Sequence, residues 1–258
     1  MPHVISVHGG DVLGLVERWE AGRAVVATAL ASARLTLANS EGIARHSRAL
    51  GACEVRVVHL GTDLPPAGAL ADPAAREPPL LVTVAHLVAR KRHADVLRAM
   101  ALLRDRRPSL RYRVIGDGPE RGALVRLAAE LGLADRVEFD GQLAHAEALR
   151  RARDGSVFVL PSIDEAFGVA YVEAMAGGLP AIGCRGEPGP REIAAAGGGI
   201  RLVAPGDTDA LAGEIDALLA DRAALRAAGA QARATVEAAF TWERCGAETV
   251  RAYEDALG

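Results

Sequence analysis

Short runs of apolar, often β-branched residues recur along the chain, and alanine-rich segments of helical period separate them. Leu124, Leu127 and Leu131 illustrate the helical spacing. Most of the apolar runs are continuous rather than alternating, which is typical of parallel strands covered by helices on both faces. The runs predict strands at residues 4–8, 35–38, 55–59, 80–85, 112–116, 137–140, 157–160, 180–184 and 201–203. The fold class that this pattern predicts is α/β, with a doubly wound parallel sheet.

The predicted strands fall into two groups. A segment rich in proline and alanine, residues 64–79, has no periodicity and predicts a linker between residues 1–63 and residues 80–258. The six strands after it make a complete Rossmann-like domain. The three strands before it make a partial one, because such a domain usually takes ~100 to 150 residues. The chain ends in predicted helices that break near Asp221 and Phe240, and we expect the last helix to pack back on the amino-terminal part.

Composition excludes several classes of protein. Half of the 258 residues are hydrophobic, the formal net charge is -3, and charges of both signs are interspersed, which does not suit a nucleic-acid partner. The longest uncharged apolar stretch, 24–33, is too short to span a bilayer. The three cysteines lie far apart, in neither a disulfide framework nor zinc-site spacing. We therefore expect a cytoplasmic chain with reduced thiols.

Lysine usage singles out one position. Of 30 basic residues only Lys91 is a lysine. A compact ammonium and a planar guanidinium are not interchangeable at a phosphate, so Lys91 is a candidate phosphate contact. Retention of one lysine by chance is the alternative that the sequence leaves open.

Two loops are expected to meet at the ligand-binding edge. In a sheet of order 3-2-1-4-5-6, ligands bind beyond the carboxyl ends of strands 1 and 4. In the second domain these are the strands at 80–85 and 157–160. The loops that follow them place cations opposite carboxylates and a helix start; their polar and glycine residues include His86, Arg90, Lys91, Asp164, Glu165 and Gly168.

A helix is expected to begin near Gly168 or Val169. Its free N–H groups and dipole would attract an anion, and glycine would let that anion approach the backbone. Glu173 follows Val169 by four residues and therefore lies about 6 Å further along the same face. That offset suits a ribose beside a phosphate. The alternative for Glu173 is an exposed, solvated position.

Several segments, in order along the chain, carry a resemblance to a known family. The segment EAFGVAYVE, from Glu165 to Glu173, resembles the signature of retaining glycosyltransferases of family 4, in which two glutamates enclose seven residues. HLVARK, ending at Lys91, is similar to the family's "GRLxxxK" segment, and VIGDGP at 114–119 to its "GxGP" strand end. ANS at 38–40, HLGTD at 59–63 and HGGD at 8–11 resemble further family segments. The resemblance implies the GT-B fold.

The resemblance also implies roles for individual residues. Lys91 would bind the donor diphosphate, Glu165 would contact the transferred sugar, and His8 would face that sugar from the acceptor side. His86 stands where the family more often has arginine, so the second diphosphate cation would be His86 or Arg90. The remaining donor contacts would be the ribose ligand Glu173, the backbone of three loop residues and two glycines of the "GxGP" segment: Phe167, Gly168, Val169, Gly116 and Gly118.

The activity implied is transfer of a sugar, with retention of anomeric configuration, from a UDP or GDP donor to a sugar or lipid-linked acceptor. Cell-surface polysaccharide or glycolipid synthesis is the expected process, with no metal or other cofactor and with peripheral contact at the inner face of a membrane. The family's first strands have no counterpart in this sequence. Two alternatives therefore stay open: a fragment that binds a nucleotide sugar without transfer, and a GT-B-like epimerase.

Other patterns in the sequence are less informative about function. GDGPERG at 116–122 imitates a dinucleotide fingerprint with the wrong spacing, and Pro119 suits the first position of a helix. Asp207-Thr-Asp209 spells a metal-binding motif but is better explained as a helix N-cap. His3, His46 and His145 receive no role. A sugar contact and plain solvation stay open for Glu187, Arg191 and Glu192.

Overall fold

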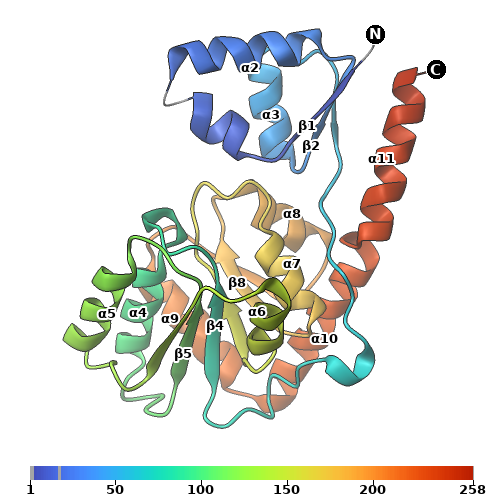
Figure 1. Ribbon diagram of the computed structural model, residues 1–258. Helices are drawn as coiled ribbons and strands as arrows, with labels where there is room; N and C mark the ends of the chain where they lie inside the picture. Colours follow the sequence, from blue (N-terminus) through green and yellow to red (C-terminus); the bar gives the residue numbers. More distant parts are fainter. Residues whose placement is uncertain (1–2, 17–18, 258) are drawn as a thin grey trace.

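The computed structural model describes residues 3–16 and 19–257 and contains two parallel sheets (Figure 1). The first sheet has the order β1-β2-β3, and its strands are β1 (Val4–Val7), β2 (Leu35–Ala38) and β3 (Val55–Val57). The helices connected to these strands are η1 (Gly10–Leu15), α2 (Glu20–Ser32) and α3 (Glu41–Ala49). Ser40 caps α3, because its side chain accepts a hydrogen bond from the Ile43 amide.

The second sheet has the order β6-β5-β4-β7-β8-β9, so the winding reverses between β4 and β7 as predicted. Its strands are β4 (Leu80–Val84), β5 (Arg111–Ile115), β6 (Val137–Gly141), β7 (Val157–Val159), β8 (Ala181–Cys184) and β9 (Ile200–Val203). The helices of this part are η2 (Ala67–Ala69), η3 (Ala89–Lys91), α4 (His93–Leu102), α5 (Arg121–Glu130), α6 (His145–Ala152), α7 (Val169–Ala176), α8 (Pro188–Ala196), α9 (Thr208–Leu219) and α10 (Arg222–Ala239).

Helices cover both faces of the second sheet. Leu81 packs in a cluster with residues of α4, α5 and α9, whereas its neighbours Leu80 and Val82 pack against α6 on the other face. Helices α7, α8 and α10 complete that second face around Phe158. Because successive side chains of a strand point to opposite faces, burial on both sides requires the continuous apolar runs of the sequence.

The chain passes twice between the two sheets. It leaves the first sheet after β3 and returns after α10, and the Thr62 amide donates to the Phe240 carbonyl where the two passages lie side by side, 3.0 Å between the atoms. The last helix, α11 (Trp242–Leu257), then packs Ala252 and Ala256 against the first sheet (Figure 1). We call the first sheet with η1, α2, α3 and α11 the first part, and the second sheet with α4 to α10 the second part.

Most predicted helix ends are confirmed, and one is wrong. Asp207 and Asp221 cap α9 and α10 with their side chains, and α10 ends before Phe240. Pro119 does not begin α5: Glu120 is the N-cap, and its carbonyl accepts the first helical hydrogen bond, from the Leu124 amide. Pro119 lies in the turn before the helix, which the Arg121 amide closes by donating to the Gly118 carbonyl.

Candidate functional site

The loops after β4 and β7 meet at the carboxyl ends of the second sheet, as their strand order predicts. The Ile163 amide donates to the Arg90 carbonyl at 2.8 Å and joins the two loops directly. Arg92 takes a left-handed conformation, φ 55°, at the turn from η3 into α4. The joined loops form one wall that faces the first part.

Lys91 and Glu165 form an ion pair at this wall. The Nζ of Lys91 lies 2.5 Å from Oε2 of Glu165, and the two side chains are only 12% and 11% exposed. The Ser162 hydroxyl donates to the same carboxylate oxygen at 2.9 Å. An ion pair with so little solvent is sensitive to an added charge, because both ions have lost most of their hydration. An anion that reaches Lys91 therefore competes with Glu165.

Helix α7 begins beside this ion pair, where the sequence predicts it. Gly168 is the N-cap with φ 94°, and a Cβ at this position would lie 2.4 Å from Cδ2 of Tyr171. Both the dihedral and the space therefore require glycine. The first N–H groups of a helix have no intrahelical partner, so this end offers donors to an anion. The Phe167 side chain is buried, which leaves its backbone as the part that can face a ligand.

Glu173 has a partner that the sequence analysis missed. Oε1 of Glu173 lies 2.7 Å from Nε2 of His145, the first residue of α6. Glu173 is 14% exposed, whereas His145 is 72% exposed and covers the carboxylate from the solvent side. Only the packing of α6 beside α7 reveals this contact. A ribose at Glu173 would have to replace the imidazole.

Glu187 holds the loop after β7 in place. Its carboxylate accepts a hydrogen bond from the Glu165 amide at 2.8 Å. This contact with the loop backbone is neither the sugar contact nor the plain solvation that the sequence leaves open for Glu187. Glu187 is also the N-cap of α8, so it connects that helix to the backbone of the ion-paired glutamate.

Gly116 and Gly118 pack against the chain's own backbone. A Cβ on Gly116 would lie 2.0 Å from the Ala85 carbonyl oxygen, and one on Gly118 would lie 2.5 Å from the Leu87 carbonyl oxygen. This close approach of the loops after β4 and β5 accounts for both glycines without a ligand. His86 is exposed on the same loop, and its side chain has no hydrogen bond among those found in the described residues.

A buried polar network lies beneath His86. The Tyr112 hydroxyl lies 2.8 Å from Oγ1 of Thr83 and 3.3 Å from Nδ1 of His93, and Nε2 of His93 lies 3.5 Å from the His86 carbonyl. Burial lowers the pKa of His93 to about 4 and raises the pKa of Tyr112 above its ordinary value. Both groups are therefore neutral at neutral pH and hold the loop by hydrogen bonds.

Two cavities separate the parts at this wall. The smaller, about 270 Å³, is lined by Lys91, Glu165, residues 166–170 and, from the first part, His8 and Asn39. Asn39 is buried, donates its amide to the His8 carbonyl, and leaves Oδ1 without a partner among the described residues. The sequence analysis gave Asn39 no role of its own; its hydrogen bond fixes the backbone of His8 beside the cavity.

Arg90 lies on the larger cavity rather than beside Lys91. This cavity, about 460 Å³, is lined by Arg90, His8 and Glu187, among other residues of both parts. Arg90 donates from Nη1 to the Asp164 carbonyl at 3.3 Å. Adjacent residues thus line different cavities, while His8, Glu165 and Ala166 line both.

Residues 71–235 match the family "Glycosyl transferases group 1". The chain belongs to this family. The matched region covers nearly all of the second part, from the segment before β4 to within α10.

Known proteins agree with that assignment. The chain is 38% identical over 154 residues to an exopolysaccharide phosphotransferase of Streptomyces coelicolor, covering 59% of this chain and 16% of that protein. It is 31% identical over 176 residues to the GDP-mannose-dependent monoacylated alpha-(1-6)-phosphatidylinositol monomannoside mannosyltransferase of Corynebacterium glutamicum, covering 65% and 45%. The chain thus spans less than half the length of either relative.

A solved structure has the same arrangement of both parts of the chain. Anabaena HepE in complex with UDP and glucose superposes with a TM-score of 0.83 over 98% of this chain and 71% of that one, at 22% identity. The chain therefore has the GT-B fold that the sequence resemblance implies. No helix among the described residues is long and apolar enough to cross a bilayer.

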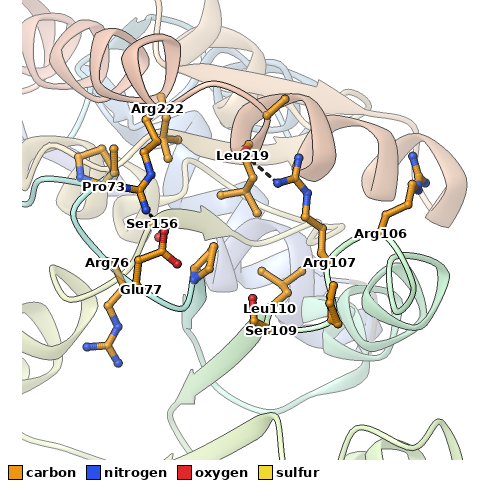
Figure 2. Close-up of a pocket in the computed structure, with 15 residues that line it drawn as sticks. Pro73, Arg76, Glu77, Arg106, Arg107, Ser109, Leu110, Ser156, Leu219 and Arg222 are labelled. Carbon is orange, nitrogen blue, oxygen red and sulfur yellow. Dashed lines mark hydrogen bonds and ion pairs between the residues drawn. The ribbon is translucent and has the colours of Figure 1, made fainter.

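A third cavity lies at the opposite, amino end of β4, β5 and β7 (Figure 2). It measures about 440 Å³, and three of the arginines that line it have partners of their own. Arg106 and Arg107 both pair with Asp216, and Arg222 pairs with Glu77. Most of its cations are therefore paired within the fold, and the loop edge is the stronger candidate site. Within residues 3–16 and 19–257, no three His, Cys, Asp or Glu side chains gather where they could hold a metal ion.

Proposed function

We propose that the chain transfers a sugar, with retention of anomeric configuration, from a nucleoside-diphosphate sugar to an acceptor in cell-surface polysaccharide or glycolipid synthesis. The observation that carries the proposal is the nearly buried pair of Lys91 and Glu165 beside the start of α7, in a cavity between the two parts. Cation, carboxylate and free amides converge there on one small volume. That arrangement suits a diphosphate joined to a sugar.

In the proposed reaction the site would stabilise the negative charge that builds up on the diphosphate. As the bond between sugar and phosphate lengthens, Lys91, His86 and the amides of Gly168 and Val169 stabilise the leaving group. Glu165, released from Lys91 by the incoming phosphate, contacts the sugar. Glu173 takes the ribose hydroxyls once His145 moves aside. Neither a covalent intermediate on Glu165 nor a metal ion is part of the proposal.

The acceptor would enter from the first part. His8 lines both cavities and would face the sugar. The relatives, an exopolysaccharide phosphotransferase and a phosphatidylinositol monomannoside mannosyltransferase, support a cell-surface acceptor that is a sugar or a lipid-linked sugar. An acceptor of the second kind would bring the chain to the cytoplasmic face of a membrane.

Thermal unfolding with UDP, GDP, ADP and NAD tests the donor site. A ligand at 100 times its Kd adds ~2.7 kcal/mol to the free energy of unfolding, and so raises Tm by about 5 to 10 °C. We expect this rise with UDP or GDP, its loss in Lys91→Met, and its retention in the control Arg106→Met, whose side chain lines the cavity at the opposite end of the second sheet. No rise with any nucleotide, or equal loss in both variants, would reject the proposed donor site.

Product analysis tests the reaction. Incubation with UDP-glucose or GDP-mannose and a panel of sugar and lipid-linked acceptors should yield a glycoside whose anomeric proton matches the donor configuration by NMR. Nucleotide binding without any product would favour the binding-only alternative. A changed nucleotide sugar in the absence of acceptor would favour an epimerase.

A further inference from the structure

The two parts of the chain are joined by a carboxylate at the back of the candidate site. Glu192 of α8 accepts a hydrogen bond from the Glu41 amide, at the start of α3, at 2.9 Å. Its other oxygen lies 2.7 Å from Nε2 of His59, in the segment that follows β3. Glu192 is 21% exposed, so both contacts are partly shielded from water. One side chain of the second part thus binds two separate segments of the first.

His59 connects this contact to the loop at 161–168. Its ring stacks on Phe167 with 5.6 Å between the centroids and meets the edge of Phe240 at 5.5 Å. Phe167 and Phe240 are both fully buried and contact each other at 5.7 Å. Phe240 lies where the chain returns to the first part, beside Thr62 on the outgoing passage. The three rings therefore join both passages to the loop that carries Glu165.

Helix α8 touches the same loop at two further points. At its start, Glu187 accepts from the Glu165 amide at 2.8 Å. Two residues later, Gly189 lies so close to the loop that a Cβ would come within 2.0 Å of the Phe167 carbonyl oxygen. A shift of α8 must therefore move residues 165–167, because no space separates the helix from their backbone.

We propose that Glu192 and His59 are positioning residues that couple the contact between the two parts to the conformation of loop 161–168. While Glu192 binds Glu41 and His59, α8 is fixed, and the backbone of residues 165–169 is held in the arrangement that surrounds the Lys91–Glu165 pair. When the parts separate, α8 and the ring cluster are released together. Neither residue touches the ion pair; both act through α8 and Phe167.

Hydrogen exchange measures this coupling directly. In Glu192→Ala, peptides covering residues 162–170 should exchange faster than in the unaltered chain, because the loop opens more often. Glu192→Gln keeps an acceptor for the Glu41 amide and should restore most of the protection. The matched control is Asp255→Ala, which removes a carboxylate that binds Arg56 at 2.7 Å within the first part and has no contact with loop 161–168. It should leave exchange in that peptide unchanged.

Nucleotide affinity provides the second readout, and this readout alone rests on the proposed function. We expect Glu192→Ala to weaken binding of UDP or GDP about fivefold, at the lower end of typical couplings between sites, and Asp255→Ala to leave it unchanged. Unaltered exchange in Glu192→Ala, or equal acceleration in Asp255→Ala, would overturn the proposal. Faster exchange in Glu192→Ala alone, with no nucleotide bound by any form, would uphold the coupling and count against the proposed donor site.

Discussion

The Lys91–Glu165 pair makes a sharp prediction about stability. Lys91→Met removes the charge but keeps most of the apolar stem, so the main change is that the Glu165 carboxylate loses its cation. Removing one partner of a buried ion pair costs ~3 to 5 kcal/mol. Glu165 keeps its bond from Ser162 and is 11% exposed, so we expect the lower end, about 3 kcal/mol. Tm should fall by about 6 to 12 °C.

The double variant separates folding from ligand binding. Glu165→Gln keeps an acceptor for Ser162 but leaves the Lys91 ammonium without its counter-ion, so it should also destabilise the chain. Lys91→Met/Glu165→Gln removes both charges and should return the free energy of unfolding to within about 1 kcal/mol of the unaltered chain, because a buried pair is often replaceable as a unit. Nucleotide affinity should stay at least about tenfold weaker in the double variant, because the phosphate contact is still missing.

Urea denaturation followed by circular dichroism, with calorimetric titration of UDP and GDP, measures both quantities on the same four proteins. A cost of less than about 1 kcal/mol for Lys91→Met, well below the buried-pair range, would contradict the prediction. The prediction is equally refuted if the two single losses simply add in the double variant. Either result would mean that Lys91 and Glu165 do not form an ion pair in solution.

Three further predictions concern the walls of the site. Gly168→Ala should cost about 1 to 3 kcal/mol of stability and weaken nucleotide binding, because alanine resists φ 94° and its Cβ meets Tyr171; chemical denaturation and calorimetry check this. Tyr112→Phe should cost about 1 to 2 kcal/mol by urea denaturation, because Thr83 and His93 lose a buried partner. The lowered pKa of His93 means that the unfolded chain takes up a proton below pH 6.5, whereas the folded chain does so only near pH 4. Stability should therefore fall by about 3 kcal/mol as pH drops from 6.5 to 4, and His93→Asn should lack that part of the slope in a pH series of urea denaturations.

The sequence predicts the second sheet and its site-bearing edge well. Strands buried on both faces must be apolar throughout, so β4 and β7 are visible as continuous runs and their following loops can be placed together. The start of α7 is equally predictable, because Gly168 is required there by both dihedral and space. These features depend on local chemistry and on the winding of the chain.

Contacts between segments that are far apart in the sequence cannot be predicted from local patterns of this kind. Arg90 and Lys91 are neighbours, yet they serve different cavities, because successive residues of the 3-10 turn η3 point about 120° apart. The partner of Glu173 depends on how α6 packs beside α7. Both outcomes depend on the three-dimensional arrangement of the loops and helices around each residue.

The return of α11 to the first sheet has a consequence for recombination between relatives. The first part is built from both ends of the chain, and the second part sits between them as an insertion. A single junction would pair the β2 and β3 side chains with a foreign last helix and leave Leu35 and Leu37 against the wrong surface. A chimera that exchanges nucleotide specificity should therefore use two junctions, at the neighbouring residues Thr62 and Thr241, so that α11 stays with the sheet it covers.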